Sequence, residues 1–493
     1  MVDIDVVCPP HAVPPSVRLA STQGRWLLTA TILGSGLASI DATVVNVALP
    51  AIGRDLGMEF SGLQWTLTAY TLTLASFILL GGSAGDRFGR RRVFLVGVVW
   101  FAVASLLCAV APTEGLLIGA RAVQGFGAAL LTPASLAIIQ ATYAEADRAR
   151  AVGTWAGFSG VASALGPFLG GWLIEAGSWR YIFLINLPLA ALVVWLCLRR
   201  VPETRDPAAG GRLDVAGALA GVVGLGGMSY ALISAPASGA GSFGVVLPAG
   251  LGLAGLIAFV LIERRVRNPM LPPSLFGVSQ FRAINAVTFL AYGAIGATLF
   301  LLVLQLQVVS GFSPLVAGSA LLPITLVVLI FSARSGALAS RIGPRVQVTA
   351  GPLVLGLATL LGLRLQADSD YLTEVLPMTV AFGCGLAVMV APLTSAALAA
   401  APVEHAGIAS GVNNAVARAA QLLAVAAIPA AAGLTAAAYT DPAVFLTAFH
   451  AAIRICAGLF FAAAVLAALT VRQGRHSRRG SRPRSGRAVR FAP

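Results

Sequence analysis

The stretch Gly82-Ser83-Ala84-Gly85-Asp86-Arg87-Phe88-Gly89-Arg90-Arg91-Arg92 lies between two long apolar runs, residues 62–81 and 93–111. A segment with this many arginines and an aspartate cannot lie in hydrocarbon, so we expect a short aqueous loop that joins two membrane-spanning helices. Its glycines allow a tight turn, and Asp86 can accept hydrogen bonds from free amides at a helix end. Composition alone indicates a turn whose positive charge fixes its side of the membrane.

Apolar runs of this kind recur from one end of the chain to the other. The sequence has 493 residues, of which 58% are hydrophobic and 11% are charged, whereas a soluble domain carries about 25% charged residues. An apolar helix needs about 20 residues to cross a bilayer. The pattern predicts an all-α polytopic membrane protein with about fourteen spans and no separate soluble domain.

Arginine supplies all the basic charge, because the chain has no lysine and 33 arginines. If the N-terminus is cytoplasmic, 26 arginines fall in cytoplasmic segments and three on the outer side. The positive-inside rule therefore predicts an even number of spans with both termini in the cytoplasm. The same distribution argues against nucleic acid as a partner, and we expect the basic tail to lie near anionic lipid.

The run Gly82-x-Ala84-Gly85-Asp86-Arg87-x-Gly89-Arg90-Arg91, between the second and third spans, resembles the loop signature of the major facilitator superfamily. A degraded second copy occupies residues 336–345 after the tenth span, with Ser340 where the first copy has its aspartate. Parallel repeats of six helices build this superfamily. The resemblance implies a role in gating for Gly82, Asp86, Arg87, Gly89 and Arg90.

The two copies lie where two six-helix bundles with two extra central helices would place them. The extra pair resembles the fourteen-helix branch of the superfamily rather than the twelve-helix branch. We predict a cytoplasmic N-terminal tail (1–25), an N-terminal six-helix bundle (26–198), two inserted helices (213–262), a C-terminal six-helix bundle (283–471) and a basic cytoplasmic tail (472–493).

Asp41 is the one carboxylate that the sequence places deep in a span, where a charge costs about 2.5–3.5 kcal/mol. It opens the run 41–50, which resembles the first-helix signature of the fourteen-helix drug:proton antiporters of the EmrB/QacA type. The resemblance implies a proton or cation site, and a structural carboxylate is the alternative. A carboxylate that pairs with an arginine in only one conformation would bind and release a proton as the protein moves.

Arg121 opens the run 121–129 in the fourth span, which resembles the superfamily motif whose arginine is tied to proton coupling. An arginine that satisfies backbone carbonyls is the alternative. Asn414 and Arg418 are four residues apart in the thirteenth span and share a helix face, for structure or for substrate. Four residues are candidates for lining a central cavity: Asn46, Gln124, Asn414 and Arg418.

The fifth span contains Ala162-x3-Gly166-Pro167-x2-Gly170-Gly171, which resembles a motif associated with antiporters of this superfamily, although the motif usually begins with glycine. Small residues let helices approach closely, and Pro167 bends the helix. Such a helix could act as a hinge between the halves. Any tightly packed helix can show similar spacing, which is the alternative reading.

The sequence lacks the residues that several other functions need. The five cysteines have no metal-ligand spacing, and the absence of lysine excludes a phosphate-binding GxxxxGK[ST] loop. We expect no enzyme activity and no cofactor, and transport would be driven by an ion gradient. The predicted function is proton-coupled export of hydrophobic or amphipathic drugs across the cytoplasmic membrane, by a monomer. The alternatives are a dedicated exporter of one self-made metabolite or lipid and, more remotely, a non-transporting receptor or sensor.

Overall fold

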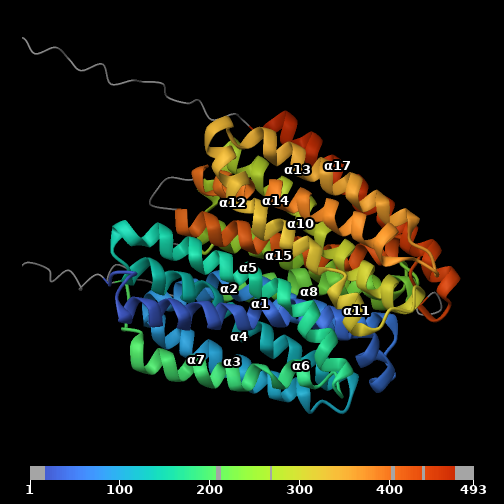
Figure 1. Ribbon diagram of the computed structural model, residues 1–493, viewed down its shortest axis with the longest axis horizontal. Helices are drawn as coiled ribbons and strands as arrows, with labels where there is room; N and C mark the ends of the chain where they lie inside the picture. Colours follow the sequence, from blue (N-terminus) through green and yellow to red (C-terminus); the bar gives the residue numbers. More distant parts are fainter. Residues whose placement is uncertain (1–16, 207–212, 267–268, 401–405, 436–438, 472–493) are drawn as a thin grey trace, which may run out of the picture.

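The computed structural model describes residues 17–206, 213–266, 269–400, 406–435 and 439–471 (Figure 1). Most of the two predicted tails therefore lies outside the described residues. Fourteen helices in the described part are long and apolar enough to cross a membrane, which confirms the predicted number. Only helices satisfy every backbone amide and carbonyl within a single spanning segment, so the apolar composition dictates this architecture.

The first half of the chain forms six spans, the sixth of which is divided into two helices. Their bounds are α1 (Thr22–Leu56), α2 (Phe60–Phe88), α3 (Arg90–Ala109), α4 (Glu114–Thr142), α5 (Glu145–Glu175), α6 (Tyr181–Leu184) and α7 (Asn186–Arg200). Side chains at the loop ends satisfy free amides: Ser21 Oγ accepts from the Gly24 amide at 3.0 Å and begins α1.

The inserted pair and the second half follow in the same order as predicted. The inserted helices are α8 (Val215–Ser238) and α9 (Phe243–Arg265). The remaining elements are η1 (Pro273–Gly277), α10 (Ser279–Leu304), η2 (Gln305–Val309), α11 (Pro314–Ser319), α12 (Leu322–Ile342), α13 (Pro344–Leu361), η3 (Gly362–Arg364), η4 (Tyr371–Val375), α14 (Leu376–Ala399), α15 (Ala406–Ala431) and α17 (Pro442–Thr470).

The two halves lie one above the other in Figure 1, with α1–α7 in the lower part and α10, α12, α13, α14, α15 and α17 in the upper part, while α11 lies level with α1. Because fourteen spans alternate in direction, the start of α1 and the end of α17 lie on the same side of the molecule. We call this the terminal side and the opposite one the far side. The predicted arrangement of two six-helix bundles with an inserted pair is thus confirmed, whereas the exact domain limits stay a prediction.

Hydrogen bonds join the two halves on the far side. Gln64 Nε2, near the start of α2, donates to the Val425 carbonyl of α15 at 2.7 Å. Gln307 Nε2 donates to the Val47 carbonyl of α1 at 2.9 Å. The Leu315 amide of α11 donates to Glu175 Oε1, at the end of α5, at 3.1 Å. The far side is therefore closed by contacts from three pairs of elements.

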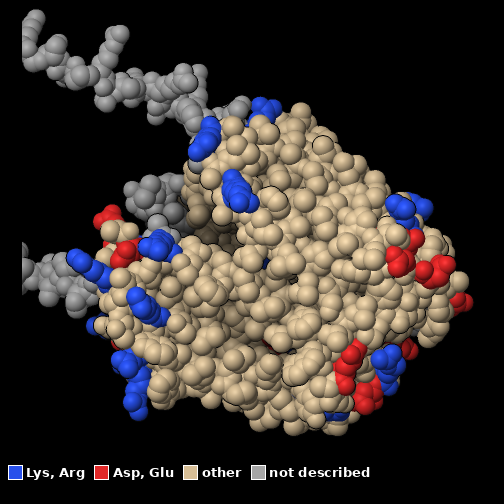
Figure 2. All heavy atoms as spheres, in the orientation of Figure 1, with Lys and Arg blue, Asp and Glu red and all other residues tan. Residues whose placement is uncertain are grey.

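The terminal side is more open between α5 and α12. A Cβ at Gly153, Gly157 or Gly160 of α5 would meet open space, whereas one at Gly171, three turns further along the same face, would overlap Pro314 of α11. The surface is hollowed between the two halves at this side, at the left of Figure 2. On the opposite flank the halves stay in contact, since Leu79 of α2 lies against Gly411 of α15. The structure is closed at the far side and open at the terminal side.

The inserted pair covers the flank where α2 meets α15. Helix α8 packs against both of these helices, and the Trp65 and Tyr230 rings lie 6.0 Å apart. Between α8 and α9, a Cβ at Gly224 or Gly255 would meet the backbone of the facing helix. Small residues therefore let the two inserted helices touch along their backbones.

The predicted aqueous loop at residues 82–92 is the main correction to the sequence analysis. Helix α2 continues to Phe88 and α3 begins at Arg90, so the break is a single residue, Gly89, with φ of 108°. The 29 residues of α2 span about 43 Å at 1.5 Å per residue, more than the hydrocarbon thickness of about 30 Å. The helix thus carries the charged turn into the aqueous region without a longer loop.

Asp86 does not use its carboxylate to accept from helix-end amides, as the sequence suggested, but accepts from Arg90 Nε at 2.8 Å. The Arg90 amide instead donates to the Thr204 carbonyl at 2.8 Å. The Arg91 amide donates to Glu203 Oε1 at 3.1 Å. The segment after α7 therefore holds the turn in place.

Replacing Gly89 tests this turn. A side chain at Gly89 would adopt an unfavourable φ and would overlap the Glu203 carboxylate. We expect Gly89→Ala to cost about 1–3 kcal/mol and to lower the apparent melting temperature of the purified protein in detergent. Gly115→Ala is the matched control, because a Cβ there meets open space. Equal melting temperatures for the two variants would contradict this account of the turn.

Candidate functional site: a buried ion-pair network in the first half

The Asp41 carboxylate and the Arg121 guanidinium form an ion pair in the interior of the first half. Asp41 lies on α1 and Arg121 on α4, and both residues are fully buried. Arg121 Nη1 donates to Asp41 Oδ2 at 2.5 Å. Each charge offsets the cost of burying the other, because an unpaired charge in a low-dielectric interior is far more costly than a paired one.

Two amide side chains complete the hydrogen bonding of the Asp41 carboxylate. Gln124 Nε2 donates to Asp41 Oδ1 at 2.9 Å, and Asn186 Nδ2 donates to the same oxygen at 3.2 Å. Each carboxylate oxygen therefore accepts from an N–H group, and no partner in this shell is positioned to accept a proton from Asp41. The arrangement is complementary to an ionised carboxylate.

Arg121 is held by further hydrogen bonds and by two aromatic rings. Its Nη1 also donates to Gln124 Oε1 at 2.5 Å, and its Nε donates to the Thr66 carbonyl of α2 at 3.2 Å. The guanidinium carbon lies 4.3 Å from the Tyr70 ring centroid and 5.8 Å from that of Phe183. Arginine is suited to this position, since its planar guanidinium donates hydrogen bonds in several directions and stacks on aromatic rings.

Ser105 of α3 connects the amides of the network to one another. Its Oγ accepts from Gln124 Nε2 at 3.2 Å and from Asn186 Nδ2 at 2.9 Å, and donates to the Phe183 carbonyl at 3.0 Å. Asn186 is the first residue of α7, just after the break that ends α6. The network thus joins α1, α2, α3, α4 and the α6–α7 break, all in the first half.

Only part of this network could be predicted from the sequence. Asp41, Arg121 and Gln124 were predicted and lie in contact. Ser105 and Asn186 were missed, because a single small polar residue in an apolar span does not stand out as a charged residue does. The one available signal was the polar Asn186 itself, inside an apolar run.

The other predicted cavity residues lie outside the network. Asn46 is half-buried on α1, whereas Asn414 is exposed and Arg418 half-buried on α15. In α15 the hydrogen-bonded amide is the neighbouring one: Asn413 Nδ2 donates to Asn285 Oδ1 at 3.1 Å and to Thr288 Oγ1 at 2.9 Å. The second half thus has a neutral polar cluster rather than a counterpart of the ion pair.

The predicted antiporter motif of α5 packs against both halves at the far side. A side chain at Gly166 or Gly170 would overlap Thr43 or Val44 of α1, and one at Gly171 would overlap the Pro314 carbonyl of α11. The Pro167 carbonyl lies close to Gly318 of α11. The motif therefore sits where α5 touches the second half, and its hinge role stays a prediction.

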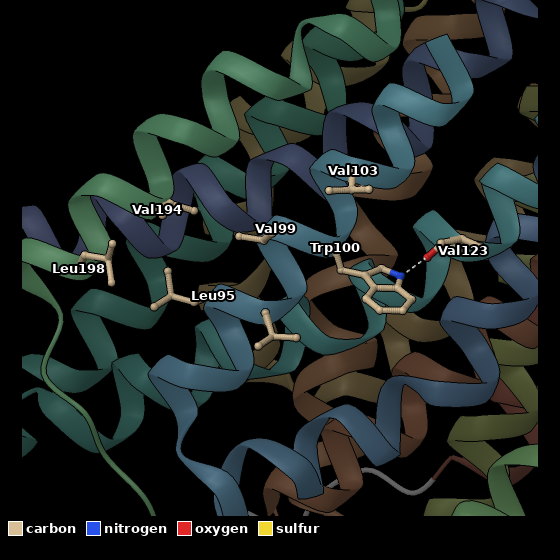
Figure 3. Close-up of a pocket in the computed structure, with 8 residues that line it drawn as sticks. Leu95, Val99, Trp100, Val103, Val123, Val194 and Leu198 are labelled. Atoms are coloured by element: carbon tan, nitrogen blue, oxygen red, sulfur yellow. Dashed lines mark hydrogen bonds between the residues drawn. The ribbon is translucent and has the colours of Figure 1, made fainter. Parts of the chain in front are cut away.

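A groove of about 590 Å³ on the outside of the first half is apolar (Figure 3). It is lined by Leu95, Val96, Val99, Trp100, Val103, Val123, Val194 and Leu198. Its one polar side-chain group, Trp100 Nε1, donates to the Val123 carbonyl at 2.9 Å, as the dashed line in Figure 3 shows. These exposed apolar side chains are typical of a lipid-facing surface, so we do not assign the groove to transport.

Comparison with known proteins agrees with this architecture. Residues 31–425 match the Major Facilitator Superfamily. The chain belongs to the major facilitator superfamily. The family consists of membrane transporters, and this member is an integral membrane protein with fourteen spanning helices.

Several relatives of this major facilitator protein are resistance proteins. The puromycin resistance protein pur8 of Streptomyces alboniger is 38% identical over 478 residues, which are 92% of this chain and 93% of the relative. The multidrug resistance protein Stp of Mycobacterium tuberculosis is 37% identical over 391 residues, 79% and 72% of the two chains. The methylenomycin A resistance protein of Bacillus subtilis is 35% identical over 80% of this chain and 84% of the relative.

Solved structures show the same fold at low sequence identity. A peptide-transporter-family protein in complex with 5-aminolevulinic acid superposes with a TM-score of 0.66 at 14% identity, covering 91% of this chain and 97% of the other. The human organic anion transporter MFSD10 gives a TM-score of 0.58 at 19% identity, covering 91% and 100%. These likenesses concern the fold alone.

The buried pair makes a prediction about stability. Removing one partner leaves an uncompensated buried charge, which costs about 3–5 kcal/mol, whereas replacing both by neutral groups of similar volume is far less costly. We expect Asp41→Asn and Arg121→Met each to lower the thermal stability in detergent, and the double variant to recover part of the loss. If the double variant lost as much stability as the two single variants together, the two charges would not stabilise each other.

Proposed function

We propose that this protein exports hydrophobic or amphipathic small molecules from the cytoplasm in exchange for protons. It would act in the cytoplasmic membrane, with both termini in the cytoplasm and as a monomer. The observation that carries the proposal is the buried Asp41–Arg121 pair, at the centre of a family fold whose relatives are named for drug and antibiotic resistance.

The network supports a proton-coupled step for a chemical reason. Asp41 is fully hydrogen-bonded as a carboxylate in this conformation. To accept a proton it must lose at least one of these donors and gain access to water. The donors come from α4 and α7, so a relative movement of these helices and α1 would open the pair. Protonation of Asp41 and the conformation of the first half would then depend on each other.

The closed far side and the open terminal side support alternating access. Here the solute would enter from the terminal side, which the arginine distribution assigns to the cytoplasm. Closure of that side and opening of the far side would release the solute outside. One proton moving inward through 100 mV releases about 2.3 kcal/mol, which would support a solute gradient of roughly fortyfold.

A second candidate is an exporter dedicated to one compound. Relatives named for puromycin, methylenomycin A and tetracenomycin C each carry a single antibiotic in their names. A panel of chemically unrelated solutes separates the two candidates, because only a broad exporter would transport several of them.

Efflux from proteoliposomes under an imposed pH gradient tests the proposal. We expect Asp41→Asn to abolish gradient-driven efflux, with a loss of at least about a hundredfold, because asparagine cannot bind and release the proton. Gradient-independent exchange of solute between the two sides should survive in this variant. Full gradient-driven efflux by Asp41→Asn would exclude Asp41 as the coupling group.

The matched control is Asp55→Asn, the same substitution in the same helix. Asp55 accepts from Arg180 Nη1 at 2.6 Å, but its side chain is 47% exposed. Such surface pairs contribute about 0–1 kcal/mol. We therefore expect this variant to retain gradient-driven efflux close to that of the wild type.

A further inference from the structure

We propose that Arg418 binds an anionic oxygen group of the exported solute, such as a carboxylate or an enolate, at the seam between the two halves. This inference rests on the proposed export function and specifies the chemical class of the solute. It follows from the depth of Arg418 in its span, from the absence of a counter-charge among the described residues and from the helix face on which Arg418 lies.

Arg418 lies near the middle of a membrane span. It is twelve residues from the first residue of α15 and thirteen from the last, so its backbone is about 18 Å from either end of the helix. The residue is half-buried rather than exposed. A cation at this depth is costly unless another group compensates it, and the distance to either end limits how far the side chain can reach towards water.

The described residues provide little compensation for this charge. The hydrogen bond that Arg418 makes within the described part of the chain is a long one, from Nη1 to Gln421 Oε1 at 3.4 Å. The ion pairs of the described part of the chain involve Arg90, Arg92, Arg121 and Arg180 instead. Arg418 thus differs from Arg121, whose charge is neutralised by Asp41. The Arg418 guanidinium keeps several N–H donors for a ligand that carries acceptor oxygens.

Helix α15 presents the face that carries Arg418 to α2 of the first half. Gly411, seven residues before Arg418, lies against Leu79 of α2. The Val425 carbonyl, seven residues after Arg418, accepts from Gln64 Nε2 of α2 at 2.7 Å. Seven residues are about two helical turns, so the three positions share one face of α15, and Arg418 lies at the seam between the two halves.

The net charge of this region indicates which solutes it favours. Asp41 neutralises Arg121 inside the first half, whereas Arg418 has no ion-pair partner among the described residues, so its positive charge is uncompensated. A cationic group would be repelled at short range in this low-dielectric region, whereas an anionic oxygen would be attracted. We therefore infer that the amphipathic solute carries an acidic group and binds with it directed at Arg418.

A matched pair of probes tests this inference with the purified full-length protein. The probes are a panel of fluorescent amphipathic carboxylic acids and their methyl esters, which share a ring system and differ in charge. Binding is measured in detergent without any gradient. We expect the wild type to prefer the acids, and Arg418→Gln to weaken acid binding by about ten- to a hundredfold while ester binding changes less than about threefold.

Two further variants separate recognition from a structural role. Arg418→Lys keeps the charge and should restore a large part of the acid preference, although lysine lacks the planar fork. Arg454→Gln removes an arginine that is exposed on α17, a helix that packs against α10 and α13 of the second half, and should leave the preference unchanged. Equal losses of acid and ester binding in Arg418→Gln, or no acid preference in the wild type across the panel, would overturn the inference.

Efflux assays with the same probes distinguish failure of this inference from failure of the export function. If the wild type exports esters under a pH gradient but neither binds nor exports acids preferentially, export stands and the role of Arg418 is wrong. If acids bind through Arg418 but no probe is moved by a gradient, the recognition site stands and proton-coupled export is wrong.

Discussion

The buried contact between Asp41 and Arg121 is the interaction on which the first half depends. Hydrocarbon offers no hydrogen-bond partners, so two charges buried within the spans are stable only when they pair with each other and their remaining donors and acceptors are also hydrogen-bonded. Gln124, Asn186, Ser105 and the Thr66 carbonyl do this in the described structure. Five spans are therefore fixed relative to one another by polar bonds at one point, around which the apolar packing is arranged.

The two halves are structural repeats, but their buried polar groups are hydrogen-bonded in different ways. The first half contains an ion pair, whereas the second contains a neutral cluster of Asn285, Thr288 and Asn413. The glycines at the two repeated turns are alike, since Gly89 and Gly343 both have positive φ, 108° and 84°. The repeat thus preserves the backbone turns, while the buried chemistry has diverged between the halves.

Much of the architecture could be predicted from sequence because hydrocarbon imposes simple rules. Apolar runs longer than about 20 residues gave the spans, and arginine distribution gave a consistent topology. Asp41 and Arg121 could be singled out individually, because charges inside spans are rare. Their pairing with Asn186 could not, since it depends on how helices 145 residues apart in the chain are rotated towards each other.

The position of the inserted helices has a consequence for the bilayer itself. Helix α8 covers the flank where α2 meets α15, whereas neither inserted helix packs against α5 or α12 in the described part of the chain. When the terminal side opens or closes, the area that the protein occupies in the membrane changes there. Lipid is then displaced mainly next to α5 and α12. The equilibrium between the open and closed forms therefore depends on the lateral pressure in the leaflet on the terminal side. Lipids that pack better around one of the two forms shift the equilibrium towards it, as a ligand that binds one form does.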